Sequence, residues 1–219
     1  MKAIKPIAMA LALLSTAIPA LHPARAEESA ATGQAQQVHE AFAKDFAQKV
    51  LAIVQDPKKD MSDRKDVLRQ AFSKSVDIDW IARFVLGKAW NEATDEQRQQ
   101  YTSLYRTYLT ESYVSNFAED PDKRIRDIRI AGVGDAEGSD FTVRTQMMLA
   151  NQDNLNVKYL VRENAGKYKV LDIIIENVSL ITTHRAEFGS IAASQGVRGV
   201  IAKLEALVSR AHSMAMSMK

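Results

Sequence analysis

Three histidines outside the first 26 residues are the side chains of this chain best suited to catalysis or metal binding. His39, His184 and His212 lie far apart in the sequence. No Gly-x-Ser-x-Gly nucleophile turn, His-Glu-x-x-His helix or other metal-ligand spacing accompanies them. The sequence therefore predicts no metal site and no cofactor, and it does not favour an enzyme.

Two pairs of carboxylates have a spacing that would suit a general acid and a general base. Asp77 stands two residues before Asp79, and Asp172 stands four residues before Glu176. Asp77 lies where a helix cap is expected, so a structural role is favoured for the first pair. Asp172 and His184 stay as candidate bases under the hypothesis that this is an enzyme.

Residues 123–129 are rich in basic side chains, namely Lys123, Arg124, Arg126 and Arg129. It has no interleaved aromatic residues, so it does not favour a nucleic-acid surface. One interpretation is a solvated edge strand that its charges protect from further pairing. The other is a patch for anionic lipid headgroups or a partner protein, with Arg126 and Arg129 as its candidate contacts.

The first 26 residues have the three parts of a secretory signal peptide. Lys2 and Lys5 form a basic region, an apolar run follows, and Ala24-Arg25-Ala26 supplies small residues for cleavage. The apolar run is too short for a membrane span. The sequence therefore predicts export, with the remaining chain soluble in the periplasm.

The predicted divisions are a signal peptide over 1–26, a disordered leader over 27–37, one α+β domain over 38–212 and a tail over 213–219. The leader is expected to be disordered because its residues are small and polar. Removing the signal removes three basic residues and no acidic ones, so the formal charge changes from +2 to −1. With no Cys in the chain, burial of apolar side chains must stabilise the fold.

Apolar residues recur at intervals of three and four in several segments, and this period predicts helices. The predicted helices cover 38–55, 62–72, 77–87, 94–120, 180–196 and 197–211. Thr94 and Gln97 have the spacing of a capping box at one helix start. Gly87 and Gly196 are expected to end helices, as glycines often do.

Between residues 125 and 176 the period changes to two, which predicts strands. The predicted strands cover 125–133, 141–149, 155–161 and 167–176. Short turn sequences join the later strands, so an antiparallel meander is expected. The predicted fold class is α+β, with a four-stranded antiparallel sheet covered on one face by several helices and an apolar pocket between the layers.

Four tyrosines, Tyr101, Tyr105, Tyr108 and Tyr113, fall on one face of the predicted helix 94–120. Tyrosine has an apolar ring and a polar hydroxyl, so such a stripe suits either a filled core or a partly wet pocket. A charge at Val143 or Tyr105 is expected to empty such a pocket. The predicted pocket lining is Phe46, Val50, Phe84, Leu104, Tyr105, Tyr108, Leu109, Tyr113, Phe141, Val143, Met147, Tyr159, Ile174, Val178 and Phe188.

The segment DIIIENVSLITTHRAEFGSIAASQGVRGVIAKL (172–204) leads from a strand carrying Asp into a helix with a late glycine. The segment IARFVLGKAWNEATDEQRQQYTSLYRTYLTESY (81–113) has Leu-Gly-x-x-Trp before an aromatic helix. In this order, the two segments resemble the hallmarks of the toluene-tolerance, or MlaC, family of periplasmic phospholipid-binding proteins. The resemblance covers roughly residues 38–210.

The chain departs from the family pattern at two positions. Asn177 stands where the family has Gly, and Asn tolerates positive φ better than other residues with a side chain, so the turn is expected to survive. Ser179 is then expected to cap the following helix. His184 stands where Tyr is common, and a pocket-rim or surface role is expected for it.

Arg185 has two interpretations at this stage. Its guanidinium could bind a lipid phosphate through two parallel hydrogen bonds. It could equally form an ion pair with Asp172 or Glu187, and the ion pair is favoured.

The resemblance implies a phospholipid carrier that shuttles lipid between the outer and inner membranes and maintains outer-membrane asymmetry. It also implies an inner-membrane ABC transporter complex with its substrate-binding subunit, and an outer-membrane lipoprotein-porin complex, as partners. Two acyl chains expose roughly thirty methylene groups, each costing about 0.8 kcal/mol in water. A carrier therefore needs an apolar pocket and few polar anchors.

Three alternatives remain open. A hopanoid-associated carrier on the same fold would take a rigid polycyclic lipid in a wide apolar pocket. An enzyme would be favoured by a buried carboxylate of raised pKa facing the pocket. A purely structural partner protein would be favoured by a cavity too small for an acyl chain.

Overall fold

The computed structural model describes residues 23–55, 61–118, 125–135 and 138–217. Residues 36–219 form one compact unit, and residues 1–35 form another. Most of the predicted signal peptide lies outside the described residues, so it stays a prediction. Within the described ranges, no helix is both long enough and apolar enough to span a bilayer.

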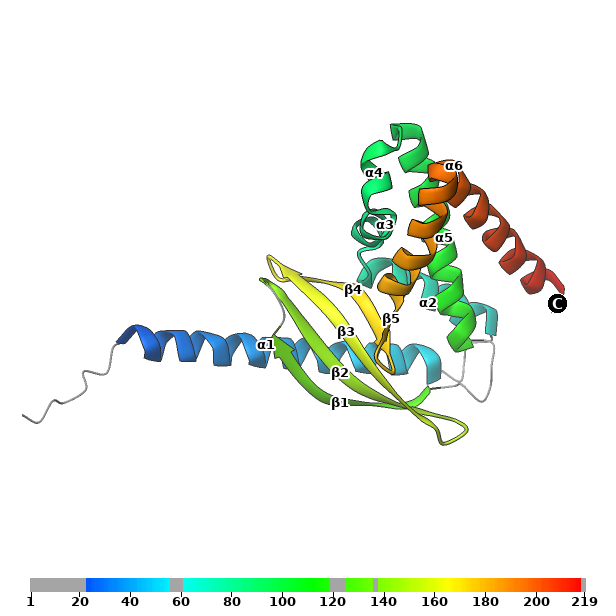
Figure 1. The fold of residues 1–219 in the computed structure, drawn as a ribbon. Helices are drawn as coiled ribbons and strands as arrows, with labels where there is room; N and C mark the ends of the chain where they lie inside the picture. The colour runs from blue at the N-terminus through cyan, green and yellow to red at the C-terminus, as the bar shows by residue number, and fades with distance from the viewer. Residues whose placement is uncertain (1–22, 56–60, 119–124, 136–137, 218–219) are drawn as a thin grey trace, which may run out of the picture. The chain divides into compact units, whose positions relative to one another are not determined.

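The chain folds as an α+β protein with one antiparallel sheet, as predicted (Figure 1). The strands pair with their sequence neighbours in the order β1-β2-β3-β4-β5, which is the expected meander. The elements are α1 (Pro23–Gln55), α2 (Met61–Ser75), α3 (Ile78–Leu86), α4 (Lys88–Glu92), α5 (Asp95–Ala118), β1 (Ile125–Asp135), β2 (Asp140–Leu149), β3 (Asn154–Asn164), β4 (Lys167–Ile175), β5 (Val178–Ser179) and α6 (Leu180–Ser217).

Two short elements were not predicted. The sheet has five strands rather than four, because Val178 and Ser179 turn back to pair with Ile175 and Ile174. Two residues are too few to display an alternating pattern, so β5 has no sequence signal of its own. Helix α4 was not predicted either, because its five residues are too few for apolar positions to recur at helical spacing.

The helices at both ends of the chain extend beyond the predicted helices. Residues 27–37, expected to be a disordered leader, have helical backbone as part of α1. These residues are small and polar, but Ala, Glu and Gln among them are also good helix formers. The tail expected from residue 213 continues α6 as far as Ser217.

One face of the sheet is apolar and buried. In β2, Phe141, Val143, Thr145, Met147 and Leu149 are all buried and alternate with more exposed residues. In a strand, successive side chains point to opposite faces, so these five share the inner face. The hydrophobic core of the unit is built on this face.

The helices are fixed to strand β4 through its backbone. Val76, the residue after α2, forms a parallel bridge with Val170 of β4. The Asp77 amide donates to the Val170 carbonyl at 3.0 Å, and the Asp77 side chain caps α3 by accepting from the Trp80 amide at 3.1 Å. Figure 1 shows α2 to α6 gathered beside the β4–β5 edge of the sheet.

The later part of α1 covers the inner face of the sheet through ring contacts. His39 stacks on Phe141 with centroids 3.8 Å apart, and Phe42 stacks on Tyr168 at 4.4 Å. A side-chain hydrogen bond of 3.3 Å joins His39 to Glu163. Close to the other end of the helix, the Gln55 amide donates to the Arg126 carbonyl at 2.6 Å.

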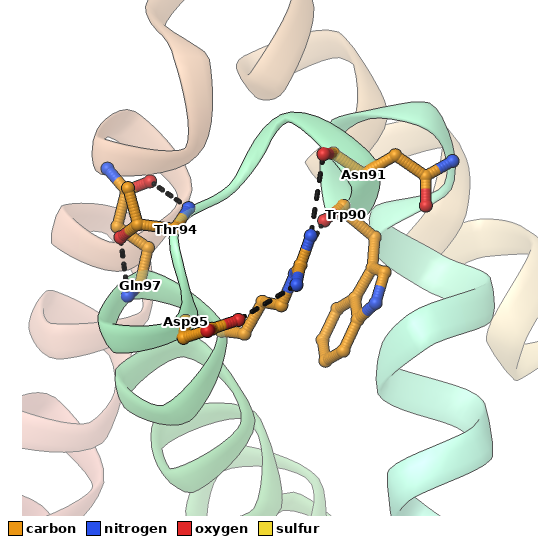
Figure 2. A network of polar contacts seen from close by, with 6 residues as sticks. Trp90, Asn91, Thr94, Asp95 and Gln97 are labelled. Carbon is orange, nitrogen blue, oxygen red and sulfur yellow. Dashed lines mark hydrogen bonds and ion pairs between the residues drawn. The ribbon is translucent and has the colours of Figure 1, made fainter.

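The capping box predicted at the start of α5 is present (Figure 2). The Thr94 amide donates to Gln97 Oε1 at 3.1 Å, and the Gln97 amide donates to Thr94 Oγ1 at 3.2 Å. Arg98 then reaches back to Asp95 and to the carbonyls of Trp90 and Asn91 at the end of α4. These bonds satisfy helix-terminal groups that would otherwise lack partners and fix the α4–α5 corner.

We expect Thr94→Ala to lower the free energy of unfolding by about 1 kcal/mol, because the Gln97 amide loses its acceptor. Urea denaturation followed by circular dichroism would measure the change. Thr107→Ala, on the same helix, is the control and should change stability by less than about 0.5 kcal/mol. Equal stability of the two variants would contradict the capping role.

Candidate functional site

An apolar cavity lies where α1, α2 and α5 meet the inner face of β3 and β4. Its volume is about 30 Å³, close to one water molecule's share of liquid volume. Its lining is Phe46, Val50, Ile53, Leu68, Ala71, Phe72, Ser75, Val76, Tyr113, Tyr159, Val170 and Ile173.

The few polar groups of the cavity wall are uncharged. Burial raises the pKa of the Tyr113 hydroxyl to about 12. Burial also raises the pKa of Tyr159 well above its ordinary value, against the opposing effect of a hydrogen bond with Thr145. Both phenols are therefore protonated at neutral pH, and Ser75 adds only a hydroxyl. The cavity suits an apolar ligand.

Four of the predicted pocket residues line this cavity: Phe46 and Val50 from α1, Tyr113 from α5 and Tyr159 from β3. The other predicted pocket residues are absent from the cavity lining. Those residues are Phe84, Leu104, Tyr105, Tyr108, Leu109, Phe141, Val143, Met147, Ile174, Val178 and Phe188. Whether any of them contacts a ligand stays a prediction.

Strict alternation along β4 predicts that Ile174 faces the cavity. A β-bulge in β4 interrupts this alternation. The register with β3 skips one residue, so that Leu160 pairs with Asp172 and Val161 pairs with Val170. The extra residue shifts the alternation, and Val170 and Ile173 share the cavity side. Val178 is 61% exposed on the short strand β5 and also lies away from the cavity.

The tyrosine stripe is mainly core rather than pocket. Tyr101 and Tyr105 are fully buried. The Tyr101 hydroxyl donates to the Ala82 carbonyl at 2.9 Å, and the Tyr105 hydroxyl lies 2.9 Å from His184 Nδ1. A charge at Tyr105 or Val143 would therefore be buried in the core and would test the fold rather than the cavity.

The α2 side of the cavity was not predicted from the sequence. Leu68, Ala71, Phe72 and Ser75 recur at the spacing of one helical face. The helix was predicted, and the spacing of these residues in the sequence could have identified the helix face that lines the cavity. Phe72 also stacks on Tyr113 of α5 with centroids 4.4 Å apart.

Asp172 holds the corner between β4 and α6. Its carboxylate accepts from Ser179 Oγ at 2.6 Å and from the Ile181 amide at 3.3 Å. Ser179 in turn accepts from the Thr182 amide at 3.0 Å, which is the predicted helix cap. Asn177 has φ of 66°, so the left-handed turn expected there is confirmed.

Burial raises the pKa of the Asp172 carboxyl above its ordinary value of 3.8, although the bonds from Ser179 and nearby amides lower it in part. This buried carboxylate belongs to the helix corner and does not line the cavity. Burial lowers the pKa of His184, which is also outside the lining. Neither candidate base faces the cavity as the enzyme hypothesis requires.

Arg185 does not form the favoured ion pair, and its predicted contact with a lipid phosphate stays a prediction. Its guanidinium donates to the Phe84 carbonyl near the end of α3 and lies 4.5 Å from the centre of the Phe84 ring. Among ion pairs between described residues, Glu187 joins Lys203, and none joins Arg185 to Asp172 or Glu187. The favoured ion pair is therefore wrong, because a carbonyl at a helix C-terminus attracts the cation instead.

Of the other polar candidates, Asp77, Asp79 and Arg129 have ordinary partners. Asp79 pairs with Arg106 at 2.5 Å, so Asp77 and Asp79 do not form an acid–base pair. Arg129 lies 3.4 Å from Asp127, and Arg126 is exposed on the edge strand β1. Within the described part of the chain, no three His, Cys, Asp or Glu side chains are grouped as metal ligands.

Two comparisons with known proteins bear on this site. The sequence model of the family described as "MlaC protein" matches residues 44–206, which include the whole cavity lining. The fold is similar to that of a phospholipid-binding protein from Ralstonia solanacearum, solved in complex with a phospholipid. That similarity has a TM-score of 0.66 and 22% sequence identity, and it covers 81% of this chain and 98% of the other.

We expect Ser179→Ala to raise the pKa of Asp172 further, because the hydrogen bond from Ser179 lowers it. A carboxyl with a higher pKa in the folded chain stabilises the fold at low pH, and this contribution is lost as the pH rises from 3.8 through the folded pKa. In the variant this loss should extend to higher pH. A titration of the Asp172 carboxyl carbon by NMR would measure the shift.

Loss of the helix cap in the same variant should also lower the free energy of unfolding by about 1 kcal/mol. Ser190→Ala, at an exposed position of α6, is the matched control and should change neither quantity. An unchanged or lower pKa of Asp172 in Ser179→Ala would contradict the proposed bond.

Proposed function

This chain belongs to the MlaC protein family, and we propose that it is a periplasmic phospholipid carrier whose acyl chains enter the cavity beneath α1. The observation that carries the proposal is this cavity, whose wall is apolar apart from neutral hydroxyl groups. The phospholipid bound by the structurally similar Ralstonia protein supports the same type of ligand.

An acyl chain requires the cavity walls to separate. A volume of about 30 Å³ is far too small for the roughly thirty methylene groups of two acyl chains. Burying those groups would repay the opening, since each methylene gains about 0.8 kcal/mol on leaving water. The lipid headgroup would then remain at the mouth of the opened cavity.

We propose that α1 is the wall that moves. The end of α2 and the start of α3 are tied to β4 by the bridge between Val76 and Val170 and by the Asp77 amide. The later part of α1 contacts the sheet through aromatic rings and through the side-chain bonds of His39 and Gln55. Side-chain contacts can be exchanged for contacts with acyl chains without unfolding either element.

The proposed carrier would work in the periplasm, between two membrane complexes. The predicted signal peptide supports a periplasmic location, where a lipid cannot cross the aqueous space unaided. We propose an inner-membrane ABC transporter complex and an outer-membrane lipoprotein-porin complex as the two partners. The transport would maintain the lipid asymmetry of the outer membrane.

The small volume of the cavity favours a second candidate, a structural partner protein with a filled core. Such a protein would keep α1 closed on the sheet and would bind no lipid. The two candidates differ in one measurable property, which is the presence of a stoichiometric lipid.

Native mass spectrometry of the exported protein, purified without detergent, should detect one adduct of phospholipid mass. Val50→Glu should lose this adduct, because a carboxylate on the cavity wall would oppose burial of acyl chains. Val50 is only half-buried, so the charge can reach water in the closed fold, and circular dichroism should remain unchanged.

Gln48→Glu adds the same charge at an exposed position of α1 and is the matched control. It should retain the adduct. A bare wild-type protein that also fails to take up lipid from vesicles would contradict the carrier proposal and support the structural candidate. An adduct of hopanoid mass would identify a different cargo for the same cavity.

A further inference from the structure

A hollow of about 230 Å³ lies on the outer face of the sheet, across strands β2, β3 and β4. Arg144, Lys158 and Ile174 line it in adjacent strands, since Arg144 pairs with Lys158 and Lys158 pairs with Ile174. Asn156 and Asn177 complete its polar wall. A defined depression with two cations and two amides resembles a recognition site more than an ordinary solvated surface.

This hollow is separate from the apolar cavity. Lys158 and Ile174 each stand next to a cavity residue, Tyr159 and Ile173, and neighbouring residues in a strand point to opposite faces. The sheet therefore lies between the two sites. An inference about the hollow goes beyond the proposed carrier function and does not depend on the cargo.

Glycines in the edge strand leave room for the Arg144 guanidinium. A Cβ atom built on Gly132 would lie 2.8 Å from Arg144 Nη2, and Gly134 lies close to the same guanidinium. Gly132 has φ of 153°, which also disfavours a side chain. The missing side chains let Arg144 lie along β1 beside the hollow.

The two cations of the hollow lack ion-pair partners in the described part of the chain. Other arginines of this face are paired, Arg129 with Asp127 at 3.4 Å and Arg162 with Asp140 at 2.7 Å. No such ion pair involves Arg144 or Lys158 among the described residues.

One carboxylate does bond a residue of the hollow. Glu176 accepts from the backbone amide of Asn156 at 2.5 Å and from its side-chain amide at 3.4 Å. Its negative charge offsets one of the two cations at most. The hollow therefore keeps a net positive charge in a protein whose predicted exported form carries −1.

We propose that this hollow docks an acidic segment of a partner protein, with Asp or Glu side chains placed between Arg144 and Lys158. Charge complementarity identifies the occupant as anionic. The depression favours a protruding carboxylate over a flat bilayer surface, because Lys158 is partly buried within it. Ile174 supplies an apolar contact beside the charged pair.

The test uses NMR spectra of the ¹⁵N-labelled protein with a capped octapeptide of alternating Asp and Glu. At low salt, millimolar peptide should shift amide signals around Arg144, Lys158 and Asn177. Arg144→Gln with Lys158→Gln should weaken the affinity about tenfold, because two surface charge pairs are lost. Raising salt to about 0.15 M should also weaken binding.

Lys44→Gln with Lys167→Gln removes the same charge at exposed positions elsewhere and should keep the affinity within about twofold. Absent shifts around the hollow, or equal affinity in both double variants, would overturn the proposal. Binding to phosphatidylglycerol vesicles without peptide-induced shifts would overturn it in favour of a membrane-surface site. The lipid content of each sample, measured by native mass spectrometry, separates failure of this docking site from failure of the carrier proposal.

Discussion

The arrangement of helices α2, α3 and α6 depends on their attachment to strand β4. Its Val170 carbonyl accepts from Asp77 between α2 and α3, and its Asp172 carboxylate accepts from Ser179 and Ile181 at the start of α6. Both attachments satisfy polar groups that would otherwise be buried without partners, so a shift of either helix would leave costly unpaired groups. The helices beside β4 are therefore held in register with the sheet.

This constraint distinguishes the two walls of the cavity. α2 is anchored to β4 through Val76 and Val170, whereas α1 contacts the sheet through side chains such as His39 and Phe42. Ring contacts are strong in sum but not tied to one backbone register, so an apolar ligand could replace them. A fixed wall facing an exchangeable wall would suit the proposed lipid carrier. The opposite face of the sheet carries Arg144, Lys158 and Asn156, which line the hollow.

The sequence by itself determined the features that depend on residues close together in the chain. The capping box of Thr94 and Gln97, the cap at Asp77 and the left-handed turn at Asn177 were all predicted and are confirmed. The break at Gly196 is confirmed in the same way, with φ of 66° inside α6. Each of these depends on backbone preference or on a hydrogen bond spanning a few residues, and periodicity likewise reports only local geometry.

Only the tertiary structure decided which side chains meet. The bulge at Leu171 turns Val170 and Ile173 to the cavity and Ile174 to the outer face, and it arises from pairing with β3 rather than from any local pattern. Arg185 was expected to bind a carboxylate near it in sequence, yet it binds a carbonyl about a hundred residues away. The period of a strand shows only that its side chains alternate between two faces. Which face is buried depends on strand register and helix placement, and both result from contacts between distant segments.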